Sequence, residues 1–357
     1  MKKTIFFALF VLTFLNFDAI AADTTPLVAY KLQGQWHVLD KTGKELLSTS
    51  KVMEVLGFSN GYLRVKIKRA VKEIITFMKM DGTIVEIPDV DQVWNFSEGR
   101  AVAVKYLDEL KTKNLYGFLD ENLKIVIPVQ YTDATDFHEG LAFLRSDRKR
   151  GYINKKGDYE FYLDSLVGYD FSEGIAKVNN EAAFFGFIDK KGKLIINLKF
   201  DEVGNFTSGL CYGNNIEKYG YFDTKGQFAI KPIYDYTNNF SEGFAFVGKL
   251  DSKFKTNWGI IDTAGKEYGK FEYDKFRDFS DGLAAVLKGD KWGFIDRTST
   301  YIIEPQYTSA DSFVEGLAWA SEGKANKYGF INKKGIFIVS IPKPDKVVDL
   351  RQNRIVN

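Results

Sequence analysis

The stretch Asn257-Trp258-Gly259-Ile260-Ile261-Asp262, followed by Ala264-Gly265, determines the architecture of this chain because close relatives of it recur along the sequence. Each copy has an aromatic residue, a glycine, two apolar residues and an Asp or Asn, and in the first two copies His37 and Met78 replace the glycine. Nine copies can be recognised, and they begin at Trp36, Phe77, Tyr116, Arg150 (in place of the aromatic residue), Phe185, Tyr219, Trp258, Trp292 and Tyr328.

A second motif, Phe-x-x-Gly, alternates with the first. Its copies begin at Phe58, Phe96, Phe137, Phe171, Phe206, Phe240, Phe279 and Phe313. The unit therefore repeats about every 35 residues, and periods of this size are typical of solenoids, propellers and other repeat arrays.

Each repeat is predicted to form short strands joined by turns. After Phe279, residues 283–287 form an apolar strand, residues 288–290 a hairpin tip and residues 292–296 a second strand. An Asp/Asn-x-x-Gly turn follows, in which the first side chain caps the backbone and the glycine takes positive φ. A third strand, such as 228–230, and a short fourth one complete the unit. Because no helical periodicity occurs in the array, the fold is predicted to be all-β.

The strands are apolar on both faces. In Trp292-Gly293-Phe294-Ile295 the alternation of a strand sends Trp and Phe to one face and Gly and Ile to the other. Neither face is polar, so we expect each sheet to be covered on both sides. The repeated glycine predicts that a neighbouring sheet approaches closely at this point.

These residues resemble the bacterial WG-repeat family, also called KWG repeats. Residues 291–296, 302–307 and 313–318 follow its consensus piece by piece, and the resemblance covers about residues 27 to 340. It implies a non-enzymatic scaffold of tandem β-hairpin repeats, stacked as an open β-solenoid or superhelical array or closed into a propeller-like ring. Uneven repeat lengths favour the open form, and the tail, residues 341–357, is either a capping strand or disordered.

The N-terminus predicts export. Residues 1–22 have the two lysines, short apolar run and Ala19-Ile20-Ala21 site of a signal peptide, which leaves residues 23–340 as the array of eight to nine units. No transmembrane helix is expected in the mature chain, which is predicted to be periplasmic, associated with the outer envelope or secreted. The 49 basic and 47 acidic residues balance, which argues against nucleic acid as a partner.

No catalytic, metal-binding or cofactor-binding constellation is evident. His37 and His138 are interpreted as repeat drift, and Cys211, the single cysteine, as a buried inert thiol. A cation-binding row is the alternative to turn capping for the repeated Asp120, Asp189, Asp223, Asp262 and Asp296. The carboxylates of the Phe-Ser-Glu-Gly turns are interpreted as solvated, namely Glu98, Glu139, Glu173, Glu242 and Glu315, with Asp281.

One hairpin of the repeat carries insertions, and its tips are basic. In a repeat array equivalent loops lie along one edge, where binding faces are commonly built. The candidate binding residues on this edge are Lys68, Arg69, Lys111, Lys113, Arg148, Lys149, Lys253 and Lys255. They predict an anionic partner, such as an acidic envelope glycan or protein surface; a solvated edge whose lysines prevent aggregation is the alternative. The function expected is an exported scaffold for a protein or peptide partner, with envelope glycan binding as the second reading.

Overall fold

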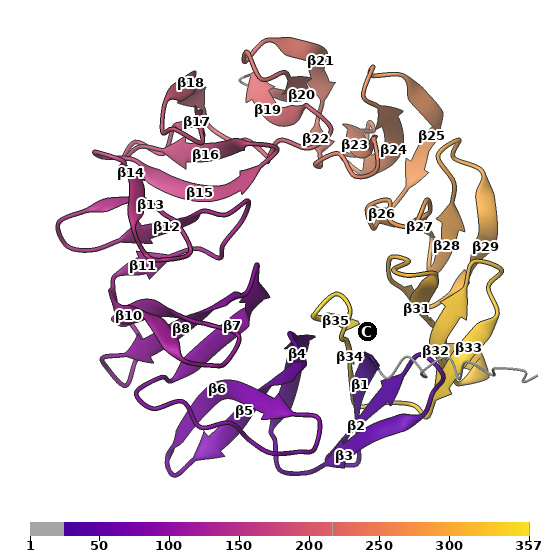
Figure 1. Ribbon diagram of the computed structural model, residues 1–357. Helices are drawn as coiled ribbons and strands as arrows, with labels where there is room; N and C mark the ends of the chain where they lie inside the picture. Colours follow the sequence, from indigo (N-terminus) through magenta and orange to yellow (C-terminus); the bar gives the residue numbers. More distant parts are fainter. Residues whose placement is uncertain (1–24, 216, 357) are drawn as a thin grey trace, which may run out of the picture.

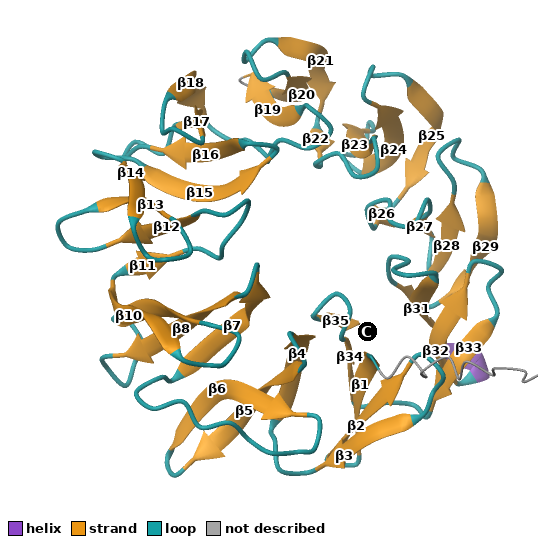
Figure 2. Ribbon diagram, in the orientation of Figure 1, coloured by secondary structure: helices purple, strands orange, loops and turns teal. Residues whose placement is uncertain are grey.

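The structure is a computed structural model that describes residues 25–215 and 217–356. Within these ranges the strands pair into nine sheets, which stand as blades around a common axis (Figure 1). The only helical element there is one 3-10 turn, η1 (Gly323–Ala325), and strands dominate the rest (Figure 2). The molecule is therefore an all-β propeller. The predicted signal peptide, residues 1–22, lies outside the described residues.

Blade 1 combines the two ends of the described chain. From the outside inwards it contains β3 (Glu45–Thr49), β2 (Gln35–Asp40), β1 (Pro26–Leu32), β34 (Lys346–Asp349) and β35 (Arg354–Val356).

The next three blades follow in chain order, each running from its inner to its outer strand. Blade 2 contains β4 (Glu54–Ser59), β5 (Tyr62–Arg69) and β6 (Lys72–Lys79). Blade 3 contains β7 (Gln92–Ser97), β8 (Arg100–Tyr106), β9 (Asn114–Leu119) and β10 (Ile125–Tyr131). Blade 4 contains β11 (Asp133–Ala134), β12 (Ala142–Arg145), β13 (Arg150–Ile153) and β14 (Tyr159–Tyr162).

Blades 5 to 7 continue the same arrangement. Blade 5 contains β15 (Val167–Ser172), β16 (Ile175–Asn179), β17 (Phe185–Asp189) and β18 (Leu194–Phe200). Blade 6 contains β19 (Cys211–Asn215), β20 (Lys218–Phe222) and β21 (Phe228–Tyr234). Blade 7 contains β22 (Tyr236–Thr237), β23 (Phe244–Leu250), β24 (Thr256–Asp262) and β25 (Glu267–Tyr273).

The last two blades complete the ring. Blade 8 contains β26 (Lys275–Phe276), β27 (Ala284–Lys288), β28 (Lys291–Ile295) and β29 (Tyr301–Tyr307). Blade 9 contains β30 (Ser309–Ala310), β31 (Leu317–Glu322), β32 (Lys327–Asn332) and β33 (Phe337–Ile341).

The ring is closed by pairing between the two ends of the chain. β1 runs antiparallel to β34, with Val28 opposite Asp349 and Tyr30 opposite Val347. The tail therefore supplies capping strands, and the ring is the correct one of the two predicted forms; the preference for an open array was wrong. Uneven repeat lengths do not prevent closure, because the extra residues lie in hairpin tips beyond the blade body.

The hydrophobic core lies between adjacent blades rather than within one sheet. Phe294 of blade 8 packs with Phe313 and Ile331 of blade 9, while the next residue, Ile295, packs with Phe246 of blade 7. This alternation confirms that both faces of the sheet are covered. Every blade is thus stabilised by its two neighbours, as in other repeat proteins.

The repeated glycine allows a close backbone approach, but not the one predicted. A Cβ on Gly293 would lie 2.7 Å from the carbonyl oxygen of Ile303 and 2.8 Å from the nitrogen of Pro305. Both atoms belong to β29, the outer strand of the same blade, so the expected contact with a neighbouring sheet was wrong. The pairing of β28 with β29 shifts register here, and Pro305 is tolerated because an outer strand needs no further donor.

Candidate functional site

The two ends of the blades form two different faces of the ring. Inner strands run toward the Phe-x-x-Gly turns, so these turns and the Asp/Asn-x-x-Gly turns lie on one face, here named the turn face. The hairpins that join the second to the third strand lie at the opposite end of each sheet and form the hairpin face. Its longest described tip is residues 107–113, followed by 180–184 and 251–255.

The eight predicted basic residues all lie on the hairpin face, but only some of them are near one another. Lys68 and Arg69 end β5 in blade 2, and Lys111 and Lys113 lie in the tip of the neighbouring blade 3. The other four lie on blades 4 and 7, namely Arg148 and Lys149, and Lys253 and Lys255. The consecutive blades 2, 3 and 4 therefore each carry candidate basic residues, while blade 7 lies apart from them in the ring (Figure 1).

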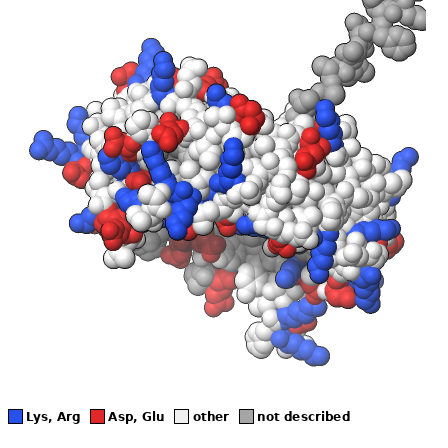
Figure 3. Space-filling view, turned by 90° about the horizontal axis from the view of Figure 1, so that it is seen from below, with Lys and Arg blue, Asp and Glu red and all other residues white. Residues whose placement is uncertain are grey.

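Carboxylates offset the positive charge of this face. Arg69 lies 3.6 Å from Glu86, and Lys255 lies 2.5 Å from Asp274, whose hydrogen bond raises the pKa of the lysine. Figure 3, which views the rim of the ring from below, shows basic and acidic side chains interspersed there as well. The basic hairpin tips thus have carboxylates close to them.

Exposed apolar side chains distinguish the extended tips, and sequence reasoning missed them. Val71, at the tip between β5 and β6, is 92% exposed, and Leu110 in the next tip is 85% exposed. Leu107 and, on blade 7, Phe254 are exposed as well. The sequence does contain this signal, because apolar residues stand at the tips of the inserted loops. The interpretation was based on the neighbouring lysines instead.

A cavity of about 410 Å³ lies between the hairpins of blades 2 and 3, here named the blade 2–3 cleft. Val71 and Tyr106 supply apolar lining, and the remaining lining residues are Lys72, Glu73, Asp91, Asp108, Glu109 and Lys111. A second cavity of about 370 Å³, which Lys68 and Arg69 help to line, lies along the same β5–β6 hairpin. The candidate residues of blades 2 and 3 thus border concave surface, as Arg148 and Lys149 do in a separate cavity of blade 4.

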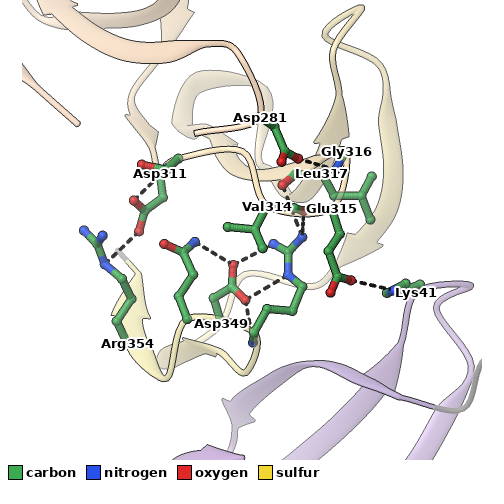
Figure 4. Close-up of polar contacts among 12 residues, drawn as sticks. Lys41, Asp281, Asp311, Val314, Glu315, Gly316, Leu317, Asp349 and Arg354 are labelled. Carbon is green, nitrogen blue, oxygen red and sulfur yellow. Dashed lines mark hydrogen bonds and ion pairs between the residues drawn. The ribbon is translucent and has the colours of Figure 1, made fainter. Parts of the chain in front are cut away.

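The turn face is cross-linked from blade to blade. The carboxylate of Glu98 accepts hydrogen bonds from the backbone N–H groups of Glu139 and Gly140 in the next blade, at 2.7 and 2.9 Å. Burial alone would raise the pKa of Glu98, but its bonds from Lys155 and these amides lower it. Analogous bonds join Glu139 to Gly174, Glu173 to Ser208 and Gly209, Glu242 to Gly282, and Asp281 to Gly316 (Figure 4).

These carboxylates lie in solvent-accessible turns, as interpreted, but the interpretation missed their hydrogen bonds to the next blade. Glu315 also has a partner, since it lies 2.6 Å from Lys41 of blade 1 and so bridges the two ends of the array. Within each Phe-x-x-Gly turn, the residue before the glycine has φ near +50°, as at Asp281 (53°), and the glycine has φ near +80°. These two positive φ angles are the geometry of a type I′ turn. This turn directs the carboxylate sideways to the next blade.

The repeated Asp that begins each Asp/Asn-x-x-Gly turn caps that turn, as predicted. Asp262 Oδ1, for example, accepts hydrogen bonds from the N–H groups of Ala264 and Lys266 at 2.9 and 3.0 Å. Among the described residues no group of three or more His, Cys, Asp or Glu side chains is arranged to hold a metal ion. Burial raises the pKa of the Cys211 thiol, which suppresses the nucleophilic thiolate.

Polar residues recur just before the Phe-x-x-Gly turns, within or shortly after the inner strands, and sequence reasoning also missed them. The residue immediately before the repeat Phe is polar in seven copies: Asn95, Asp136, Asp170, Asn205, Asn239, Asp278 and Ser312. A signal was present, because a polar residue preceding each Phe is as regular as the glycine that follows it.

Several of these groups are buried and unsatisfied. Asp136 Oδ1, Asp170 Oδ1 and Asn95 Oδ1 have no hydrogen-bond partner among the described residues, nor does Arg64 Nε. Burial raises the pKa of Asp136 to about 6, with Asp170 adding to the shift and His138 and Arg64 opposing it. His138 Nε2 lies 3.4 Å from Asp170, so the histidine is part of this polar sector. Unsatisfied buried groups are costly, and four of the ten such atoms among the described residues belong to this sector.

A family model described as a WG containing repeat matches five segments of the chain. It matches residues 116–149, 185–212, 219–253, 258–292 and 292–324. The chain belongs to the WG-repeat family. The matched WG repeats lie on blades 3 to 9, so the two blades whose repeat glycine is replaced by His37 and Met78 fall outside the matched segments.

The comparison with solved structures bears on the fold alone. A crystal structure of the eukaryotic initiation factor is similar with a TM-score of 0.56 and 9% identity, over 88% of this chain and 95% of that one. BamB from Moraxella catarrhalis is similar with a TM-score of 0.41 and 8% identity, over 86% and 93%. None of the curated proteins compared with the chain matches it. No described helix has the length and apolar character required to span a membrane.

Proposed function

We propose that this WG-repeat propeller is an exported, non-catalytic scaffold that binds a protein or peptide partner in the blade 2–3 cleft. The observation that carries the proposal is the exposure of Val71 and Leu110, at 92% and 85%, beside a cavity of about 410 Å³. Large apolar side chains exposed next to a concave surface are typical of interaction sites.

The charge around the cleft supports a polypeptide partner. Lys72 and Lys111 line it together with Glu73 and Asp108, so the rim of the cleft offers both signs of charge. Lys111 is held beside the cleft with its ammonium 4.8 Å from the ring centroid of Tyr106. A mixed rim around an apolar centre is complementary to a peptide with apolar and charged side chains, and less so to a uniformly anionic polymer.

Export rests on the predicted signal peptide, residues 1–22, and places the proposed partner in the cell envelope or outside the cell. Fractionation of the source organism should recover the protein outside the cytoplasm, and deletion of residues 1–22 should retain it inside. Cytoplasmic recovery of the intact protein would refute this part of the proposal.

The docking surface can be tested by site-specific photocrosslinking in the source organism. A photoreactive residue at position 110 should capture one discrete partner, and the additional change Val71→Ser should reduce that capture several-fold. The matched control is position 254 on blade 7, because Phe254 is as exposed as Leu110 (85%) but lies outside the cleft. Equal capture at both positions, or none at position 110, would count against the cleft.

Glycan binding is the alternative, and one observation favours it. Tyr162 is 54% exposed and lines a cavity of about 350 Å³ with Arg148 and Lys149, which is a suitable arrangement for an acidic sugar. However, Lys149 lies 5.2 Å from the centroid of that ring and competes for one of its faces. Sedimentation with insoluble envelope polysaccharide that is lost in Tyr162→Ala and kept in Val71→Ser would favour the glycan over the polypeptide.

A further inference from the structure

A further cavity, with a defined polar lining, lies on the turn face, where blades 7 to 9 meet the C-terminal β34–β35 turn. Its volume is about 420 Å³. The polar groups that matter for its chemistry belong to Asn238, Arg277, Asp278, Ser312, Gln352 and Arg354. It lies at the opposite end of the blades from the blade 2–3 cleft, so nothing in its chemistry depends on the proposed docking surface.

The two arginines are positioned by one buried carboxylate. Asp311 is only 2% exposed; its Oδ2 lies 3.2 Å from Nε of Arg354, and its Oδ1 lies 3.4 Å from Nε of Arg277. The Arg277 contact is an ion pair without hydrogen-bond alignment, since this Nε has no hydrogen-bond partner. The backbone N–H of Ser312 donates to Asp311 Oδ1 at 2.8 Å and fixes the carboxylate further.

Because Asp311 contacts both side chains through Nε, their terminal Nη groups are left for another acceptor. Figure 4 shows the guanidinium of Arg354 meeting Asp311 through one nitrogen while its other two point away. Among the described residues, the interactions of Arg277 and Arg354 include no hydrogen bond from an Nη atom. Arg277 also lies 5.2 Å from the ring centroid of Trp292, which restricts its plane. Two oriented guanidinium groups beside a cavity have the geometry that recognises a carboxylate.

Asp278 provides an opposite charge on the same cavity. Its carboxylate accepts a hydrogen bond from Asn238 Nδ2 at 2.7 Å. Burial raises the pKa of Asp278, although this hydrogen bond and the charges of Arg354 and Arg277 act to lower it. A carboxylate next to Asp278 is repelled unless the ligand also carries a cation. The lining therefore selects a ligand in which both charges lie close together.

We propose that this cavity binds a carboxylate that has a cationic group nearby, with the carboxylate between Arg277 and Arg354 and the cation against Asp278. Free basic amino acids and the C-terminal residues of basic peptides share this chemistry. Gln352, which already donates to Asp349 at 3.2 Å, retains its amide carbonyl as a further acceptor for the cationic group.

Isothermal titration calorimetry on the full-length chain tests the proposal without any substitution. The probes are free L-lysine and a hexapeptide ending in lysine, each as the free acid and as the C-terminal amide. At least one free acid should bind saturably and at least tenfold more tightly than its amide. Which of the two binds distinguishes an amino acid from a peptide as the source of the carboxylate.

Three variants locate the binding. Arg354→Gln should weaken it at least tenfold, and Asp278→Asn should remove the preference for lysine over a simple carboxylate such as acetate. The matched control is Arg297→Gln, because Arg297 is also an ion-paired arginine of the turn face (3.2 Å from Glu242) but lies outside the cavity; it should bind like the original chain. Equal binding of acid and amide, tighter binding of inorganic phosphate, or no saturable binding by any probe would overturn the proposal.

Discussion

The turn face and the hairpin face are built from the same repeats, but only the turn face makes the same contacts from blade to blade. On the turn face the same residue types make the same contact from blade to blade, as Glu98 does with Gly140 and Glu173 with Gly209. On the hairpin face the loops differ in length, and apolar residues such as Val71 and Phe254 are exposed at the tips. The comparison indicates that contacts on the turn face maintain the ring, while the hairpin face carries loops of different length with exposed apolar tips.

The ring closure belongs to the turn-face system as well. Asp349 is fully buried and accepts hydrogen bonds from the backbone N–H, Nε and Nη2 of Arg351, at 3.0, 3.0 and 2.6 Å. Arg351 Nη1 in turn donates to the carbonyl oxygen of Leu317 at 3.2 Å, which joins blade 1 to blade 9. The difference between the faces therefore predicts that the largest effects on stability lie at the turn face.

Asp349→Ala should give the largest loss of stability. It leaves the buried guanidinium of Arg351 without its carboxylate, and breaking such a pair costs about 3–5 kcal/mol. Chemical denaturation should show this decrease in the free energy of unfolding. The double variant Asp349→Asn with Arg351→Met, which removes both charges, is the control and should recover much of the loss. A small effect of Asp349→Ala would mean that the closing contact is not a main support of the ring.

Gly293→Leu tests the blade body, which the two faces share. A side chain at this position meets the backbone of Ile303 and Pro305, which cannot move aside as a side chain does. We expect a loss of about 3 kcal/mol, at the upper end of the range for overpacked cores. Gly289→Leu in a hairpin tip is the control, because a Cβ there meets no atom within 4 Å, although its φ of +64° adds modest strain. Unchanged thermal stability of Gly293→Leu would contradict the close approach of β29.

The sequence predicted the parts of this fold that a single repeat contains. The strands, the capping by Asp262 and the need for glycine at position 293 all depend on neighbours within about 15 residues, so the local pattern reveals them. The family resemblance predicted the same architecture, and the profile match confirms it.

Contacts between repeats could not be predicted in this way. Glu173 bonds to Ser208 and Gly209, about one repeat further on, and one repeat gives no indication of how its neighbour is oriented. Asp311 and Arg354 come from different blades, so their meeting depends on ring closure, for which the sequence left two geometries open. The candidate basic residues all lie on the hairpin face, but carboxylate partners such as Asp274 for Lys255 lie in the links between blades.

The pH dependence of stability separates the two faces by its sign. On the turn face the pKa of Asp136 is raised to about 6, chiefly by burial, so the folded state favours the neutral acid. Stability is therefore lost as the pH rises from about 4 through 6. On the hairpin face the pKa of Asp108 is lowered, first by the hydrogen bond from Thr112, so this carboxylate contributes stability that is lost as the pH falls.

Asp136→Asn should accordingly stabilise the protein at pH 7.5 by about 1–3 kcal/mol more than at pH 4. Asp108→Asn should instead destabilise it at pH 7.5 and at pH 4, and this effect should shrink only as the pH falls below about 4. Thermal unfolding at pH 7.5, at pH 4 and at a pH well below 4 measures the two differences, and Asp158→Asn, an exposed change on the same blade as Asp136, is the control. Profiles of the same sign for both variants would remove the electrostatic distinction between the faces.

The smallest expected effect compares single exposed residues on the two faces. Glu173 is exposed, yet its carboxylate accepts hydrogen bonds from the N–H groups of Ser208 and Gly209 at 2.6 and 2.8 Å, so Glu173→Ala should cost about 1 kcal/mol. Lys253→Ala, also exposed but at a variable hairpin tip, should change stability by less than about 0.5 kcal/mol. Hydrogen exchange makes the comparison local: the amides of Ser208 and Gly209 should lose protection in Glu173→Ala alone. Equal stability and unchanged exchange in the two variants would show that the repeated carboxylates of the turn face do not link the blades.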